Sequence, residues 1–267
     1  MSPPQAGMRA DDCGESTTPP PRQTDPAGEI ARLERIPGDY QHRALVRGLP
    51  VQRYWHLAKQ RLIDARFPLD GSDDVLDIGC GSGVVADFMA AKARTVVGID
   101  GSGDAVDFAR ATFIRDNLHF EQFLFENLVL ERHAYSAAVC MEVFEHLDTH
   151  AVSQLLAKTA GALRAGGRVL VTTPNYRGVW PVLEWLADRS GKVPHLEGDQ
   201  HVTQFNAGRL RKALMDAGFE VYEQGTFCTF APFASTLSEA LADRILKLEL
   251  RANLGFGALL YAVARRP

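Results

Sequence analysis

The chain has 267 residues, of which 46% are hydrophobic and 23% charged, and its formal net charge is −4. This composition is ordinary for a globular protein, and the negative balance disfavours nucleic acid as a partner. The four cysteines form no C-x-x-C pair, which argues against a zinc site or a disulfide framework and favours a reducing cytoplasm. No run approaches the roughly 18 apolar residues that cross a bilayer, and no secretion signal is evident, so we expect a cytoplasmic protein.

The first part of the chain differs in composition from the rest. Residues 1–27 hold six of the 14 prolines and almost nothing apolar, which predicts a disordered leader. Residues 28–267 are expected to form one domain. Its opening section, 28–70, is predicted to contain cap helices, a short one over 29–35 and a longer one over 51–66 with apolar residues at helical spacing.

A predicted strand, a glycine-rich turn and a helix follow. Residues 75–78 suit a buried parallel strand, and residues 84–91 have helix-forming composition. Between them, three alternating glycines remove the Cβ atoms that would keep a ligand off the backbone: Gly79, Gly81 and Gly83. Because the first N–H groups of a helix have no partner within it, we expect a polar ligand over this turn.

Two acids flank the turn. Asp77 stands two residues ahead of the first glycine, where a carboxylate would repel a diphosphate and attract an amino group. Asp100 closes a second apolar run, 95–100, where a parallel strand can present an acid to ribose hydroxyls. The expected ligand therefore carries a ribose. A nicotinamide-dependent oxidoreductase is the alternative, disfavoured because Gly83 lies one residue too early for the G-x-G-x-x-G spacing.

D-I-G-C-G-S-G followed by V-V-G-I-D resembles the first two motifs of class I S-adenosylmethionine-dependent methyltransferases, and the resemblance extends over about residues 75–221. It implies a doubly wound, mostly parallel seven-stranded α/β sheet with an antiparallel last strand. It also implies S-adenosyl-L-methionine as cofactor, bound by Arg53, Asp77, Gly79, Gly81, Gly83, Asp100, Asn127 and Met141. Arg53 would hold the cofactor carboxylate and Asn127 the adenine amine, with a solvated arginine and a turn residue as the respective alternatives.

The candidate catalytic residues follow a predicted strand over 134–141. The E-x-x-E-H pattern of residues 142–146 resembles ubiquinone-biosynthesis O-methyltransferases and small-RNA 2′-O-methyltransferases. Glu142, Glu145 and His146 would share one face of a helix, which suits a proton relay or a divalent metal site. The resemblance adds a later histidine as the fourth metal ligand, His201, with His195 in reserve. Three interpretations stay open: a metal site, His146 as a metal-free general base, or a structural cluster.

Two later segments depart from simple strand–helix alternation. Residues 176–202 are predicted to form a substrate lid, with packing against the core as the alternative. Residues 227–250 show apolar spacing typical of an amphipathic helix that lines a pocket, contacts a membrane surface or joins the core.

Taken together, the motifs predict a methyltransferase acting on a small molecule, with a hydroxyl oxygen of an aromatic or lipidic metabolite as the acceptor. A non-catalytic S-adenosylmethionine-binding partner subunit is a further alternative. Peripheral membrane contact and the oligomeric state are left open.

Overall fold

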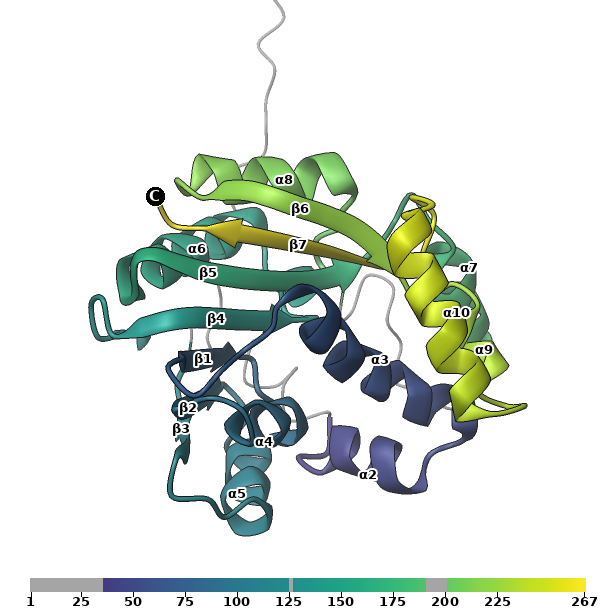
Figure 1. The fold of residues 1–267 in the computed structure, drawn as a ribbon, viewed down its shortest axis with the longest axis horizontal. Coiled ribbons are helices and arrows are strands. Elements are labelled where there is room, and N and C mark those ends of the chain that lie inside the picture. Colours follow the sequence, from purple (N-terminus) through teal and green to yellow (C-terminus); the bar gives the residue numbers. More distant parts are fainter. Residues whose placement is uncertain (1–35, 125–126, 191–200) are drawn as a thin grey trace, which may run out of the picture.

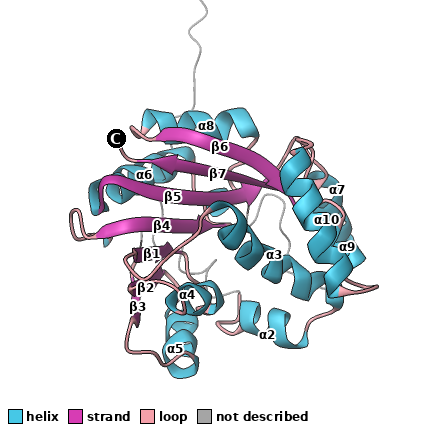
Figure 2. Cartoon of the chain, in the orientation of Figure 1, coloured by secondary structure: helices cyan, strands magenta, loops and turns pink. Residues whose placement is uncertain are grey.

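A computed structural model describes residues 36–124, 127–190 and 201–267. Within these ranges, the strands form one sheet in the order β3-β2-β1-β4-β5-β7-β6 (Figures 1 and 2). Strand β7 is antiparallel to both of its neighbours, and the other pairs are parallel. The predicted doubly wound sheet with an antiparallel last strand is therefore confirmed. The strands are β1 (Asp74–Ile78), β2 (Thr95–Asp100), β3 (Leu118–Gln122), β4 (Tyr135–Met141), β5 (Leu163–Pro174), β6 (Glu220–Phe227) and β7 (Leu259–Arg265).

Helices cover both faces of this sheet. The described helices are α2 (Tyr40–Arg47), α3 (Pro50–Arg66), α4 (Val84–Ala90), α5 (Gly103–Thr112), α6 (Thr149–Ala162), α7 (Trp180–Ser190), α8 (Ala207–Asp216), α9 (Ala231–Ala234) and α10 (Glu239–Ala252). Every residue of β1 is buried because alternate side chains enter two cores. Val75 packs with residues of α3, α4 and α5, whereas Leu76 packs with residues of α6 and α8.

Four helices gather at the end of the sheet where β5 terminates (Figure 1). We call α3, α7, α9 and α10 the helical cap. Tyr54 of α3 donates a hydrogen bond to Asp243 of α10 at 2.8 Å, and the Trp55 and Trp180 rings place α3 against α7 with centroids 5.7 Å apart. The cap therefore stands over the carboxyl ends of the parallel strands, where open α/β sheets bind their ligands.

One expectation needs correction, and one helix was missed. A single amphipathic helix over 227–250 is wrong: Phe227 ends β6, pairing with Leu259, and two separate helices follow. Sheet pairing overrode the helical spacing at Phe227, and the Ser238 side chain begins α10 afresh by accepting from the Leu241 N–H. Helix α2 was not predicted.

Some expectations fall on residues outside the described ranges. These are the leader 1–27, the short helix 29–35, His195 and the middle of the predicted lid. In the part of the chain that is described, no helix is long and apolar enough to cross a membrane.

Candidate active site

The glycine turn after β1 has the backbone conformation that glycine favours. Gly79, Gly81 and Gly83 have φ angles of 73°, 51° and 81°, in the left-handed region. Gly81 N donates to one carboxylate oxygen of Asp100 at 2.8 Å, and Ser102 N donates to the other at 2.8 Å. Asp100 therefore ties the turn to the end of β2. Its remaining lone pairs leave the carboxylate able to accept further hydrogen bonds, and its binding to ribose hydroxyls stays a prediction.

A small cavity of about 10 Å³ lies against the turn, enough for one water molecule. Polar groups from α2, α3 and β1 line it, together with the predicted Met141. The lining residues are Gln41, His56, Lys59, Asp77, Gly79, Cys80, Val84, Val85 and Met141. The predicted Asp77, Gly79 and Met141 thus meet at one place, and α3 adds Lys59, a cation that the sequence interpretation missed.

Asp77 is buried, with only 2% of its surface exposed, and its Oδ2 has no hydrogen-bond partner among the described residues. Burial raises the pKa of its carboxyl to about 7; the nearby Asp100 adds to this rise, and Lys59 opposes it. A buried carboxylate oxygen without a donor is costly. The geometry therefore suits a ligand that brings a donor, such as an ammonium group.

Lys59 and Glu142 form a partly buried ion pair beside this cavity. Lys59 Nζ lies 2.8 Å from Glu142 Oε2, and the lysine is only 4% exposed. Glu142 has a φ of 57°, uncommon for a residue with a side chain, and its Oε1 is buried without a partner in the described ranges. Such backbone strain often accompanies function.

The expected shared helix face for Glu142, Glu145 and His146 is wrong. Only Phe144–His146 forms a turn, of the 3₁₀ type, and the left-handed Glu142 precedes it. Because Glu142 is not helical, its spacing does not place it beside the other two, and its carboxylate instead pairs with Lys59.

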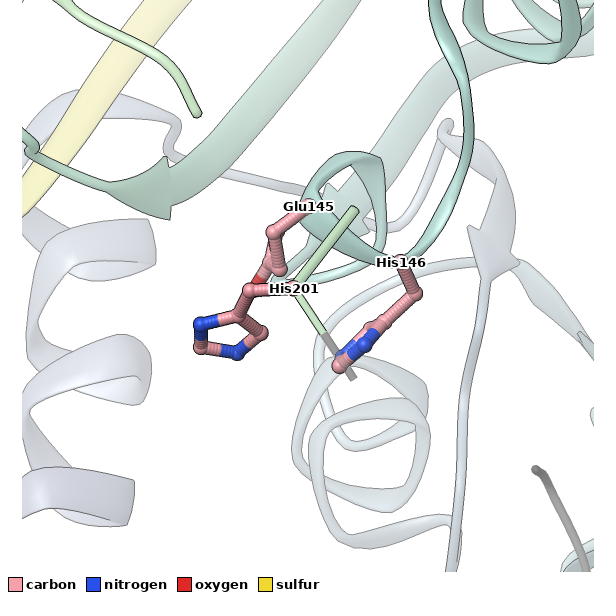
Figure 3. Close-up of side chains that lie close together, drawn as sticks. All are labelled: Glu145, His146 and His201. Carbon is pink, nitrogen blue, oxygen red and sulfur yellow. The ribbon is translucent and has the colours of Figure 1, made fainter. Parts of the chain in front are cut away.

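Glu145, His146 and His201 come together beside the end of β5 (Figure 3). One ligand atom from each lies within 4.8 Å of the others. Residues 202 and 203 donate their backbone N–H groups to the Glu145 carbonyl, which brings His201 to this position. The Glu145 carboxylate accepts from Thr173 Oγ1 at 2.9 Å, and burial raises its pKa to about 8, with Glu142 adding to the rise.

His201 is held by residues that the sequence interpretation did not single out. Its Nδ1 lies 2.6 Å from Glu184 Oε1, and the Tyr176 hydroxyl donates to the same oxygen at 2.8 Å. The Trp180 ring packs on the imidazole with centroids 5.7 Å apart. Burial lowers the pKa of His201 to about 4, so that the imidazole is neutral near pH 7.

The remaining predicted residues lie elsewhere. Arg53 is exposed and donates through Nε to the Leu45 carbonyl, and it does not line the cavity. Asn127 is exposed. In the described part of the lid, Trp180 packs inward, whereas Trp185 is 55% exposed. The cofactor roles of Arg53 and Asn127 and the lid itself stay predictions.

A signal for Lys59 was present in the sequence, since it lies in the buried stripe of α3 with Trp55, Leu62 and Ile63. A charged residue in an apolar stripe indicates a buried ion partner. Glu184 carried no such signal, because its approach to His201 depends on tertiary packing.

Both implied groups fit the residues present. The bare turn between Asp77 and Asp100 suits a nucleoside with an amino-acid end. Two imidazoles and a carboxylate form a nitrogen and oxygen donor set that divalent transition metals accept.

Known proteins resemble this chain over most of its length. A family model described as "Methyltransferase domain" matches residues 51–224. A protein of Mycobacterium tuberculosis named "Probable S-adenosylmethionine-dependent methyltransferase" is 29% identical over 171 residues, covering 64% of this chain and 57% of the relative. An Aeromonas salmonicida ubiquinone biosynthesis O-methyltransferase is 32% identical over 107 residues, covering 38% of this chain and 43% of the relative. The chain thus spans about half the length of these relatives.

The solved structures agree in fold. An S-adenosylmethionine-dependent methyltransferase of Thermotoga maritima superposes with a TM-score of 0.63 and 17% identity, covering 90% of this chain and all of that one.

Proposed function

This chain belongs to the S-adenosylmethionine-dependent methyltransferases, and we propose that it transfers the methyl group to a hydroxyl oxygen of a small molecule, aromatic or lipidic in character. The observation that carries the proposal is the grouping of Glu145, His146 and His201, with ligand atoms within 4.8 Å of one another. The site has two parts, the cavity beside the glycine turn and the group of Glu145, His146 and His201. Glu142 links them, because it follows the cavity-lining Met141 in the chain and forms an ion pair with Lys59, which also lines the cavity. A neutral imidazole can accept a hydroxyl proton.

The cavity residues account for the zwitterionic end of the cofactor. Asp77 offers an unpartnered carboxylate oxygen to the ammonium group, and Lys59 offers a buried ammonium to the carboxylate. Asp100 lies on the other side of the turn, where it would accept from the ribose hydroxyls. The charges of Asp77 and Lys59 are thus opposite in sign to the cofactor groups that they would face, and Asp100 would accept from neutral hydroxyls.

The reaction asks little of the protein beyond alignment and proton removal. S-adenosyl-L-methionine supplies a methyl group on a positively charged sulfur, whose departure leaves a neutral thioether. An acceptor hydroxyl aligned with that methyl group would lose its proton to an imidazole of the Glu145, His146 and His201 group as its oxygen displaces the thioether. A divalent cation held by these residues would lower the pKa of the hydroxyl.

Aromatic side chains adjoin this group. Trp180 packs on His201 and also contacts Trp55, in each case with ring centroids 5.7 Å apart. Flat apolar walls beside a proton acceptor suit an aromatic or lipidic hydroxyl compound. One of the relatives carries the name ubiquinone biosynthesis O-methyltransferase, which supports oxygen as the acceptor atom.

The alternatives have less support. The family match and the G-x-G-x-G spacing do not favour a nicotinamide-dependent oxidoreductase. A non-catalytic subunit would have no use for two histidines and a carboxylate whose ligand atoms lie within 4.8 Å of one another.

The test is turnover by the purified chain. Production of S-adenosylhomocysteine would be followed with catechols, phenols and long-chain hydroxy compounds, each with EDTA, Mg²⁺ or Mn²⁺. We expect turnover with at least one hydroxyl compound and a loss of about 100-fold in His146→Ala or His201→Ala. The exposed His150→Ala is the matched control and should retain full turnover. Methylation confined to amines or thiols would refute the oxygen assignment.

A further inference from the structure

We propose that Glu184 is a positioning residue, which fixes His201 so that the imidazole presents its Nε2 lone pair to the site. The proposal rests on the proposed function for its catalytic meaning, but its structural content can be tested alone. Glu184 lies on α7, 17 residues before His201.

The contact between the two side chains is short and excludes water. Glu184 Oε1 lies 2.6 Å from His201 Nδ1, and the side chains are 4% and 6% exposed. In the described ranges, no lysine or arginine forms an ion pair with Glu184. Its partners among the described residues are Tyr176 and His201, and such donors matter because a buried carboxylate without hydrogen bonds is strongly disfavoured.

The Glu184 carboxylate determines which imidazole nitrogen carries the proton, and Tyr176 is a second donor to it. Its hydroxyl donates to Glu184 Oε1 at 2.8 Å and lies 3.0 Å from His201 Nδ1. A lone pair on Nδ1 would face the carboxylate at 2.6 Å and repel it. A proton on Nδ1 instead gives Glu184 a second donor. The neutral imidazole then has its lone pair on Nε2, free for a hydroxyl proton or a metal ion.

One helix supplies both restraints on His201. Trp180 and Glu184 are four residues apart on α7 and therefore lie on the same face. Trp180 packs on the ring, whereas Glu184 holds one of its nitrogens. Ring packing alone would leave the imidazole free to turn over by 180°, so that the carboxylate is the contact that selects one nitrogen.

The tautomer can be measured directly. In the full chain labelled with ¹⁵N-histidine, the nitrogen chemical shifts of His201 should show a proton on Nδ1 alone. Glu184→Gln should lose this exclusive preference, because an amide can offer a donor as well as an acceptor. Tyr176→Phe is the matched control, since it keeps the carboxylate and should keep the tautomer.

Turnover provides a second measurement. With the best hydroxyl acceptor, Glu184→Gln should lower kcat at least tenfold without changing the affinity for S-adenosylhomocysteine. Should Glu184→Gln not fold, Glu184→Asp serves instead, because the shorter side chain withdraws the carboxylate and should also weaken the preference.

A proton on Nε2 of His201 in the unaltered chain would overturn the proposal, as would an unchanged tautomer in the Glu184 variants. Failure of the proposed function would look different: the tautomer would be as expected, but no hydroxyl compound would be methylated.

Discussion

Buried charge defines this site at the scale of single residues. Lys59, Asp77, Glu145 and Glu184 are each less than 10% exposed, and the three acids outnumber the one cation among them. Burying charge without a partner is costly, so the surrounding protein must neutralise it or a ligand must compensate it. The protein raises the pKa of Asp77 and Glu145, and it gives Glu184 two hydrogen-bond donors. The unpartnered oxygen of Asp77 is left for a ligand.

Asp77 should make the stability of the chain depend on pH. Its folded-state pKa of about 7 lies above the ordinary value of 3.8, so the folded state holds a proton that the unfolded state releases. Its stabilisation is therefore present below about pH 4 and is lost as the pH rises through 7. Between pH 5 and pH 7.5 this loss should be roughly 2 kcal/mol.

Urea denaturation of the ligand-free chain at both pH values would measure this effect. Asp77→Asn should show a smaller fall in the free energy of unfolding, by the same roughly 2 kcal/mol. Identical pH dependence in the two proteins would mean that Asp77 is ionised when buried.

Lys59 should matter for cofactor affinity and Arg53 should not. Lys59 faces the cavity beside the glycine turn, whereas Arg53 is exposed and bonded to the Leu45 carbonyl. Calorimetric titration with S-adenosylhomocysteine should show affinity about 10- to 100-fold lower in Lys59→Met, as expected for the loss of a charged hydrogen bond. Arg53→Met, the matched control from the same helix, should stay within about twofold of the unaltered chain. The reverse ranking would restore Arg53 as the carboxylate partner.

The sequence predicted the positions of those site residues that stand at the carboxyl end of a parallel strand. Asp77, the glycines and Asp100 could be placed because the ends of adjacent parallel strands meet at one edge of the sheet. Lys59 and Glu184 could not be placed, because they reach the site from helices of the cap. How a helix is oriented over a sheet depends on packing between distant segments.

At the scale of elements, the cap is joined by polar contacts as well as apolar ones. The Glu249 carboxylate of α10 accepts from three consecutive backbone N–H groups before and at the start of α9, those of Thr229, Phe230 and Ala231. Arg66 of α3 donates to the Leu250 carbonyl. Residues 227–250 are apolar at helical intervals, so spacing alone predicted one helix. The turn between β6 and α9 is stabilised by Glu249, which is distant in sequence from that turn.

Glu249→Ala should destabilise the cap. Three N–H groups, two of them in buried hydrogen bonds, would lose their acceptor, and the free energy of unfolding should fall by about 2–4 kcal/mol, as for other buried charged hydrogen bonds. Glu249→Gln keeps an acceptor oxygen and should lose less. Glu239→Ala, on the same helix but exposed, is the control and should change stability by under about 0.5 kcal/mol. Chemical denaturation would measure all three, and equal losses at 239 and 249 would contradict the role of Glu249.

At the scale of the whole molecule, the sheet order places the turn after β1 and the end of β4 side by side, since the two strands are direct neighbours. This arrangement was predictable from sequence because each parallel strand is a short apolar run followed by a helix, and such units wind in one direction. The position of α2 was not predictable. Its Gln41 lines the cavity, and the His42 N–H donates to Ser82 Oγ in the turn at 3.0 Å. Helix α2 therefore covers the turn that the cofactor must reach.

Cofactor binding should consequently stabilise the whole chain. A ligand that joins β1, β2 and the helices above the turn binds the folded state alone, and at 100 times its Kd it adds about 2.7 kcal/mol. For a chain of this size, that corresponds to a rise in Tm of about 5–10 °C. S-adenosylhomocysteine should give this shift in a thermal melt, whereas NAD should give none because Asp77 and the G-x-G-x-G spacing disfavour a diphosphate.

Gly81→Val should abolish the shift, since even a Cβ at Gly81 would lie 2.6 Å from the Gln41 side chain on backbone with φ of 51°. Gly161→Ala, on α6, where an added Cβ would meet no atom within 4 Å, is the control for changing a glycine and should keep the shift. A larger Tm rise with NAD than with S-adenosylhomocysteine would contradict the assignment of this turn to S-adenosylmethionine.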